Sequence, residues 1–549
     1  MTTPSSAFRL ERLRWGALWA VAALIVPLLA GVEPPGDHPE AIKVAVVTAL
    51  MAVMWVGVIV PLWITALLPL ALFPLLGIHS FSATLEPYSS PLIMLFFGGF
   101  ILALAMFRCG LSLRLSLVIV RLADERPGAI IFGCMATTAF LSMWVSNTAS
   151  TMVMLPMALA VIALLRHTVR PAKMANIDGE SSFATALLLG IAYSASIGGM
   201  GTLVGTPPNA ILAGFLRESF SYEIGFFEWM TFGIPLVAVL LVAAWFWLTR
   251  ILFRFDPAPI KGTNAMIDQQ LAELGPMSHF EKWIAAIATL TALAWITRPL
   301  LNRIANDAIP GWTVSDANIA VAAATVVVAV FIVKSSFFEH TSGILEKTSS
   351  FTLHPLNNHW LESKIPRPVL MRLDNVSFLF ANLDWRVLTL IGGGLALSMA
   401  IKQSGLGAWL IGGGSGYFEL AAIPGIPLVF SMMVILLLTT LAMTELASNS
   451  ATAAVFVPIF ALLAIGLGEN PLVLAIPAAL ISSCAFMLPV ATPPNAIVYG
   501  SGRITTGQMA RAGIRLDLTA VTVIALLVTA LLSMMLGVEQ GVVPDWAQR

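Results

Sequence analysis

Two short polar motifs each occur twice in this otherwise apolar chain. The stretch Trp144–Thr151 (WVSNTAST) is matched by Glu445–Thr452 (ELASNSAT), and Gly205–Ile211 (GTPPNAI) is matched by Ala491–Ile497 (ATPPNAI). Small polar residues and prolines inside apolar sequence are typical of membrane helices that break near the bilayer midplane and line a binding site there. Matched pairs of such breaks predict a transporter built from two structural repeats.

The composition is that of a membrane protein. The chain is 58% hydrophobic and only 11% charged, whereas a typical soluble protein is about 25% charged. Apolar runs long enough to cross the ~30 Å hydrocarbon core recur along its length, so we predict an all-α polytopic membrane protein. The 29 basic and 29 acidic residues balance, which gives no indication of a nucleic-acid partner.

Thirteen apolar segments define the predicted topology. Two of them, 128–166 and 421–466, carry a Ser-Asn motif at their centre and are expected to be re-entrant hairpins, since an irregular turn at membrane depth must be buried in protein or line a cavity. The other eleven are predicted transmembrane helices, at residues 15–31, 42–60, 61–77, 89–107, 182–204, 229–250, 282–300, 317–334, 385–401, 470–490 and 515–537.

The distribution of basic residues supports this threading. Those on one side of the membrane are Arg9, Arg12, Arg14, Arg108, Arg114, Arg121, Arg126, Arg166, Arg170, Lys173, Arg250, Arg254, Lys261, Arg503, Arg511 and Arg515. The opposite loops are acidic or mixed, so the positive-inside rule places the N-terminus in the cytoplasm and the C-terminus outside an inner (cytoplasmic) membrane. A full crossing at 128–166 would invert every later loop and remove this bias.

The two halves align beyond the motifs. Gly98-Gly99 matches Gly393-Gly394, and Pro156 matches Pro458, in the same order along the chain as the motif pairs. Segment 89–107 is threaded from outside to inside, but 385–401 runs from inside to outside. The two repeats are therefore predicted to be inverted with respect to each other.

The motif residues favour coupled binding of a cation and an anion. A turn between two helices presents carbonyl oxygens at one helix C-terminus and N–H groups at the next N-terminus. Carbonyls and hydroxyls suit a hard cation such as Na⁺, and the N–H groups with Asn and Thr side chains suit the oxygens of an anion. The paired prolines prevent a continuous helix. Because the motifs hold no Lys, Arg or His, an anion there would need bound cations to offset its charge.

These motifs resemble those of the divalent anion–sodium symporter (DASS) family, which carries dicarboxylates, citrate or sulfate. The resemblance runs from about Leu67 to Thr506, and segment 335–384 is its main departure. In that family the Ser-Asn-Thr turns form the tips of two hairpins and contact substrate and sodium.

Carried over to this chain, the resemblance implies specific site residues. Two Na⁺ sites are implied, the first at Ser142, Ser146, Asn147 and Gly205, and the second at Thr444, Ala447, Asn449 and Ala491. The implied substrate site comprises Asn147, Thr148, Thr206, Pro207, Asn449, Ser450, Thr492 and Pro493. Ser450 stands where dicarboxylate carriers often have threonine. Serine retains the hydroxyl group, but the selectivity for substrate size stays open.

The resemblance also implies a homodimer working as an elevator, with a small dianion, Na⁺ and the bilayer as partners. The expected segments are 1–127 (scaffold spans 1–4 and a first arm helix near Leu111–Ala123), 128–262 (first hairpin and mobile spans 5–6), 263–334 (scaffold spans 7–8), 335–384 (cytoplasmic insertion), 385–420 (scaffold span 9 and a second arm helix near Leu406–Gly414) and 421–549 (second hairpin and mobile spans 10–11).

The function expected from these observations is Na⁺-coupled transport of C4-dicarboxylates such as succinate, malate and fumarate. A Na⁺-independent dicarboxylate exchanger, a Na⁺-coupled sulfate or citrate carrier and an anion channel remain as alternatives. The chain contains no HExxH, GxSxG or Walker A sequence, so an enzyme is not expected. The roles of Glu445 and of the insertion 335–384 stay open at this point.

Overall fold

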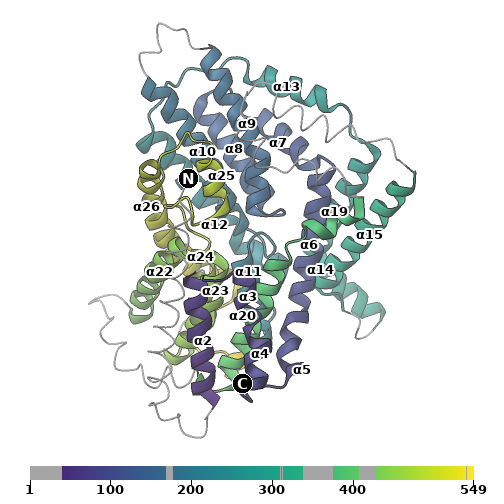
Figure 1. Ribbon diagram of the computed structural model, residues 1–549, viewed down its shortest axis with the longest axis vertical. Coiled ribbons are helices and arrows are strands. Elements are labelled where there is room, and N and C mark those ends of the chain that lie inside the picture. Colours follow the sequence, from purple (N-terminus) through teal and green to yellow (C-terminus); the bar gives the residue numbers. More distant parts are fainter. Residues whose placement is uncertain are drawn as a thin grey trace, which may run out of the picture.

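The computed structural model describes residues 40–57, 59–168, 177–309, 311, 313–337, 375–406, 427–539 and 541–548 (Figure 1). Within these ranges every regular element is helical, which confirms the predicted all-α class. Ten helices in this described part of the chain are long and apolar enough to cross a membrane. The predicted span 15–31, most of the insertion 335–384 and nearly all of the second arm helix lie outside the described residues.

The helices follow the same order in the two halves. The first repeat contains α6 (Pro91–Arg108), α7 (Leu111–Arg121), α8 (Pro127–Ser142), α9 (Asn147–Thr168), α10 (Ile177–Gly199), α11 (Pro207–Phe220) and α12 (Phe226–Phe246) with its π-helical extension η3 (Trp247–Leu252). The second contains α20 (Trp385–Gln403), α22 (Leu428–Leu446), α23 (Asn449–Gly466), α24 (Leu472–Ser482), α25 (Pro493–Tyr499) and α26 (Thr506–Val523), continued by the π-helical η5 (Ile524–Val528) and α27 (Thr529–Leu536).

The remaining helices flank these repeats. They are α2 (Glu40–Val56), α3 (Leu62–Thr65), α4 (Leu68–Leu75), α5 (Phe81–Leu85), η1 (Glu86–Ser89), α13 (Thr263–Leu274), α14 (His279–Ala308), α15 (Asp316–Phe337), α19 (Asn375–Asn382) and η6 (Asp545–Ala547). The sequence analysis did not assign α13, a surface helix tied to α7 by an Arg121–Asp268 ion pair of 2.7 Å. The helix expected near Leu111–Ala123, in contrast, is present as α7.

Each predicted hairpin consists of two helices joined by a short tip. Helices α8 and α9 pack against each other, as do α22 and α23. The first hairpin lies in the upper half of Figure 1 and the second in the lower half. The repeats also interlock, because α9 of the first hairpin contacts α25 and α23 of the second hairpin contacts α11.

Three predicted spans are not continuous helices over their full length. Segment 61–77 divides into α3 and α4, where Pro69 in the first turn of α4 lacks the N–H that a continuous helix would need. Segment 470–490 is helical only over Leu472–Ser482. Segment 182–204 likewise loses its helix after Gly199. In the last two cases the chain unwinds ahead of a Thr-Pro-Pro-Asn motif, which lengthens the break beyond the motif itself.

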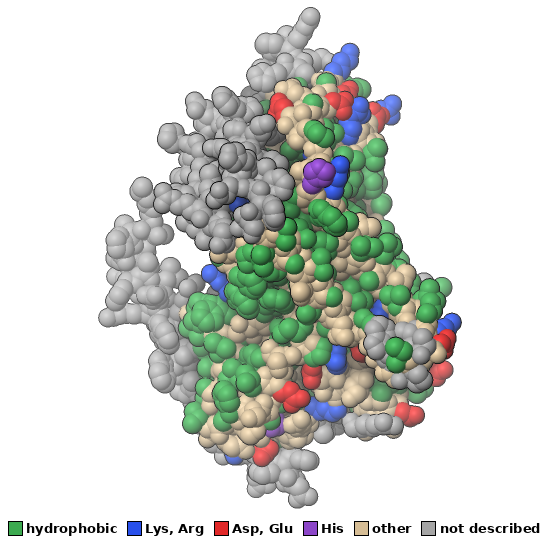
Figure 2. Space-filling view, turned by 90° about the vertical axis from the view of Figure 1, so that its right-hand side faces the viewer, with side chains coloured by type: hydrophobic (Ala, Val, Ile, Leu, Met, Phe, Trp, Pro, Cys, Tyr) green, Lys and Arg blue, Asp and Glu red, His purple; other side chains and the backbone are tan. Residues whose placement is uncertain are grey.

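The outer surface suits a bilayer. Large apolar side chains are exposed on α14, where Leu290 and Leu300 are 65% and 56% accessible. Figure 2 shows one face of the molecule, with hydrophobic side chains across its middle and most charged side chains toward its two ends. This distribution is that of a multi-pass membrane protein.

Close helix packing depends on glycines that the two halves share. A Cβ atom added to Gly98 in α6 would lie 2.4 Å from the carbonyl oxygen of Ala320 in α15. A Cβ atom on its counterpart Gly393 in α20 would lie 2.3 Å from the carbonyl oxygen of Ala66. Small residues at such positions let helix backbones approach closely within a membrane.

We expect Gly98→Ala to force α6 and α15 apart and to lower the free energy of unfolding by about 1–3 kcal/mol, as overpacking does. The matched control is Gly99→Ala, because a Cβ atom there would make an ordinary contact 3.4 Å from Val204. The measurement is the thermal unfolding midpoint of each variant in detergent. Equal midpoints for the two variants would contradict the packing argument.

Candidate functional site

The first hairpin tip is the turn between α8 and α9, at residues 143–146, and the first break is the non-helical stretch between α10 and α11, at residues 200–206. Residues at and beside the tip and the break form one polar cluster. The Ser142 hydroxyl donates a hydrogen bond to the Ala195 carbonyl at 2.6 Å. The terminal amide of Asn147 lies 2.7 Å from the Ser142 hydroxyl, 3.2 Å from the Ala195 carbonyl oxygen and 3.3 Å from that of Gly205. The structure thus brings together three of the four residues predicted for the first cation site. The fourth, Ser146, is exposed and its hydroxyl accepts from the Ala149 amide at 3.3 Å.

The second hairpin repeats this arrangement. Thr444 donates to the Ser482 carbonyl at 2.6 Å and lies 3.0 Å from the Asn449 amide oxygen. Thr444 and Asn449 correspond in the repeat to Ser142 and Asn147, and the Ser482 carbonyl accepts from the hairpin hydroxyl as the Ala195 carbonyl does. Of the other two residues predicted for the second cation site, Ala447 ends α22 within the hairpin tip, between Thr444 and Asn449, and Ala491 directly precedes the N-cap of α25.

The asparagine of each Thr-Pro-Pro-Asn motif holds the broken helix in place. The Asn209 amide donates to the carbonyls of Gly199 at 3.1 Å and Thr202 at 2.8 Å. The Asn495 amide donates to the carbonyls of Ala485 and Leu488, both at 3.0 Å. Both side chains are fully buried. The sequence analysis missed these roles, although both copies of the duplicated motif contain the asparagine at the same position.

The first break is more tightly packed than the second. A Cβ atom on Gly199 would lie 2.6 Å from Asn147 Oδ1, and one on Gly205 would lie 2.4 Å from the Gly199 carbonyl oxygen. Only glycine fits this contact between the hairpin tip and the break. The second repeat has Ala485 and Ala491 at the corresponding positions, so its break accommodates a Cβ atom at both.

Glu445 ties the second tip to the second break. Its two carboxylate oxygens accept from the backbone amides of Met487 at 2.8 Å and Leu488 at 3.1 Å. In the first repeat Met143 takes its place, and the Thr202 hydroxyl donates to the Met143 carbonyl instead. The two repeats therefore hold tip and break together with different chemistry.

A second buried acid adjoins Glu445. Asp517 of α26 is only 1% exposed and lies beside the Glu445 carboxyl group and the backbone of Phe486. The repeat alignment places Val237 at the corresponding position of α12, since Gly233 and Gly513 make matching contacts with the two breaks. The acidic pair is thus a feature of the second half alone, and sequence reasoning did not single out Asp517.

The predicted substrate residues lie at four helix N-termini. Asn147 and Thr148 begin α9, and both are half-buried. At the start of α23, Asn449 is half-buried and Ser450 is buried. The N-terminus of a helix offers free N–H groups and the positive end of its dipole to an anion.

The two Thr-Pro pairs lie at the starts of α11 and α25. Thr206 and Thr492 are N-caps and are buried, and Pro207 and Pro493 open the helices that follow them. The Thr492 hydroxyl accepts from the Asn495 amide at 3.3 Å. The Thr206 hydroxyl makes no such capping bond.

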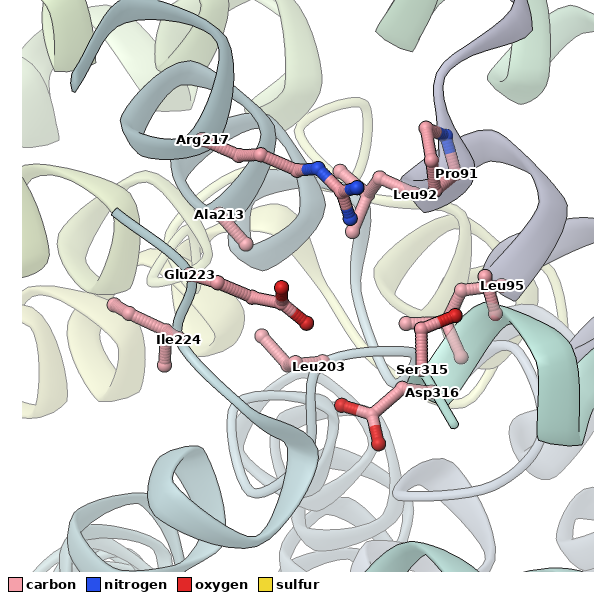
Figure 3. Close-up of a pocket in the computed structure, with 11 residues that line it drawn as sticks. Pro91, Leu92, Leu95, Leu203, Ala213, Arg217, Glu223, Ile224, Ser315 and Asp316 are labelled. Atoms are coloured by element: carbon pink, nitrogen blue, oxygen red, sulfur yellow. The ribbon is translucent and has the colours of Figure 1, made fainter. Parts of the chain in front are cut away.

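A small cavity lies away from these motifs. It holds about 30 Å³, enough for a water molecule, and lies between α6, α11 and α15. Figure 3 shows the side chains of Arg217, Glu223 and Asp316 around it. None of the predicted site residues lines it. Arg298 of α14 pairs with Glu223 at 2.9 Å and with Asp316 at 3.2 Å, so this region is an ionic contact between helices.

The described residues contain no group of three or more His, Cys, Asp or Glu side chains that could hold a metal ion. The groups that the two hairpin tips offer as ligands include hydroxyl, amide and carbonyl oxygens. Such ligands suit a hard cation and not a transition metal.

Comparisons with known proteins extend over nearly the whole chain. The sodium-dependent dicarboxylate transporter SdcS of Staphylococcus aureus (strain USA300) is 37% identical over 510 residues, which covers 92% of this chain and 89% of SdcS. SdcS of the bovine strain RF122 / ET3-1 is 37% identical over the same length.

Similarity to a solved structure supports the fold alone. The YdaH transporter of Alcanivorax borkumensis superposes with a TM-score of 0.52 at 14% sequence identity, covering 83% of this chain and 88% of that chain.

The family assignment rests on a match along the chain. The family model described as the sodium:sulfate symporter transmembrane region matches residues 12–538. That family and these relatives are transporters and not enzymes. Together with the duplicated, broken-helix architecture, this match shows that the chain belongs to the sodium:sulfate symporter family, the group whose motifs the sequence resembles.

Proposed function

We propose that this protein is a secondary active transporter that moves C4-dicarboxylates such as succinate, malate and fumarate across the inner membrane together with Na⁺. The observation that carries the proposal is the duplicated cluster of a hydroxyl, an amide and a carbonyl at the two hairpin tips. A relative named as a sodium-dependent dicarboxylate transporter, 37% identical over most of the chain, supports this substrate and cation.

The amide of Asn147 supports a cation at the first tip. The amide atom that points toward the break has only oxygen atoms around it, those of the Ser142 hydroxyl and of the Ala195 and Gly205 carbonyls. With the nitrogen turned inward, the amide satisfies these oxygens as a donor in the absence of a cation. Rotating the amide by 180° would point Oδ1 inward and complete a shell of oxygen ligands for Na⁺. One side chain can therefore serve the empty and the loaded state.

The anion would bind between the two tips. We propose Asn147-Thr148 and Asn449-Ser450 as contacts for its two carboxylates, with Thr206-Pro207 and Thr492-Pro493 closing the site. Because none of these residues carries a positive charge, the dianion depends on helix N-termini and on bound cations for its counter-charge. This dependence is the physical basis for coupling the two fluxes.

We further propose an elevator mechanism in a homodimer. Residues 128–262 and 421–549 would move, and residues 1–127, 263–334 and 385–420 would form the fixed scaffold. The interlocking contacts of α9 with α25 and of α11 with α23 support a mobile unit built from both repeats. The N-terminus would lie in the cytoplasm and the C-terminus outside.

The first test is succinate uptake into proteoliposomes with empty or succinate-loaded interiors, with and without an inward Na⁺ gradient. We expect saturable uptake into empty vesicles that requires Na⁺, because the anion site lacks its own counter-charge. Uptake only into loaded vesicles and indifferent to Na⁺ would indicate an exchanger, and non-saturable flux would indicate a channel. Uptake of sulfate or citrate in place of succinate would change the proposed substrate.

Asn147→Ala and Asn449→Ala should each lower Na⁺-dependent uptake at least about 100-fold, because each removes an amide proposed to contact both cation and anion, at ~1.4 kcal/mol per factor of ten. The measurement is initial uptake, normalised to correctly inserted protein. Asn318→Ala is the control, since Asn318 is exposed and lies outside the motifs. Near-normal uptake by both tip variants would contradict the site assignment.

Glu445→Gln should weaken the second cation site without abolishing transport. In the variant, the NH₂ group of the glutamine amide faces the backbone N–H of either Met487 or Leu488, so two donors oppose each other. Leaving this buried N–H without an acceptor lowers the free energy of unfolding by about 1–3 kcal/mol. We expect a lower unfolding midpoint and roughly a tenfold higher Na⁺ concentration for half-maximal uptake. Asp268→Asn, which alters an exposed ion pair on α13, is the control. An unchanged Na⁺ requirement would show that the Glu445 contacts do not position this site.

A further inference from the structure

A cavity of about 650 Å³ opens between the start of the first hairpin and the end of α12. It lies on the side of the molecule that the arginine distribution predicts to be cytoplasmic. Its lining residues come from α8 and the residue before it, from α12 with η3, and from the segment after η3: Arg126, Pro127, Gly128, Ala129, Phe132, Val242, Trp245, Thr249, Arg250, Phe255 and Pro257.

One end of this cavity is positively charged. The Arg250 guanidinium stacks over the Trp245 ring at 5.6 Å, and no carboxylate pairs with it among the described residues. Arg126 has an ion pair with Asp124 at 3.4 Å, but both side chains are largely exposed, so water screens this pair. The N-terminus of α8 lies at the same end and adds the positive end of a 16-residue helix dipole.

Trp245 gives this end a fixed shape. Its indole N–H donates to the Gly128 carbonyl at 2.8 Å, and its ring meets Phe132 edge-on with centroids 5.9 Å apart. These contacts hold the C-terminal end of α12 against the first turns of α8. The position of the Arg250 guanidinium over the ring is set by the same side chain.

The other end of the cavity is apolar and open to the outer surface of the protein. Phe132 of α8 and Val242 of α12 are 38% and 51% exposed. Further along α12, Val239 is also exposed, so the apolar wall continues along the lipid-facing surface.

We propose that this cavity binds an anionic phospholipid, with the headgroup phosphate between Arg126 and Arg250 and an acyl chain along Phe132 and Val242. Guanidinium groups bind phosphate oxygens with paired hydrogen bonds, and basic pockets between membrane helices suit anionic headgroups. A soluble anion would gain nothing from the apolar wall, and a zwitterionic lipid would leave the excess positive charge uncompensated. The bound lipid joins α8 to α12 at the base of the first hairpin, apart from the motifs of the transport site.

The test uses the full chain purified in a neutral detergent and supplemented with phosphatidylglycerol, phosphatidylcholine or inorganic phosphate. Bound lipid is counted by native mass spectrometry, and the unfolding midpoint is followed in parallel. We expect wild type to retain phosphatidylglycerol about tenfold more tightly than phosphatidylcholine. The combined Arg126→Ala/Arg250→Ala variant should lose that preference, and Val242→Asn should weaken binding of both lipids.

Arg254→Ala is the matched control, because Arg254 is a nearby exposed arginine that does not line the cavity. It should retain the wild-type preference. If the combined variant is not monodisperse without lipid, Arg250→Gln alone replaces it and should reduce the preference at least threefold. Equal binding of the two lipids, an unaltered preference in the arginine variant, or equal stabilisation by inorganic phosphate would each overturn the proposal.

Discussion

Two buried asparagine side chains hold this architecture together. A helix that stops inside an apolar protein leaves carbonyl groups without partners, and each one left unsatisfied is costly. Asn209 and Asn495 each donate to two such carbonyls. The paired prolines before each asparagine start the next helix without needing the N–H groups that they lack. Everything proposed for the transport site depends on these two stabilised breaks.

The repeats use a common framework and different local chemistry. In both, a hydroxyl on the last turn of one hairpin helix approaches the asparagine that begins the next, and donates to a carbonyl of the broken helix. Around this shared core, the first repeat packs Gly199 against Asn147, whereas the second places Glu445 and Asp517 beside its break. Two cation sites built on these cores would therefore differ in packing and charge despite their common origin.

The helices that surround the breaks are matched to the membrane in two ways. Shared glycines such as Gly98 and Gly393 bring backbones into contact where a side chain would keep them apart. On the outside, the apolar surface gives way to arginines near the predicted cytoplasmic ends of α8 and α12, where Arg126 and Arg250 meet lipid-facing side chains. The same protein surface thus serves helix packing, membrane contact and the proposed lipid site.

The sequence by itself determined the membrane class, the duplication, the hairpins and the family. These follow from composition and from local motifs such as Ser146-Asn147 and Thr206-Pro207, whose effects on the backbone need no distant partner. Only the tertiary structure decided where helices stop, as in segments 61–77 and 470–490, because unwinding there depends on prolines and on donors from other parts of the chain. It also revealed the roles of Asn209 and Asn495 and the pairing of Glu445 with Asp517. Glu445 and Asp517 lie far apart in the chain, so no local pattern encodes their contact. Asn209 and Asn495 lie only seven and ten residues from the carbonyls that they bind, but these carbonyls become free only where the packed structure unwinds the helix.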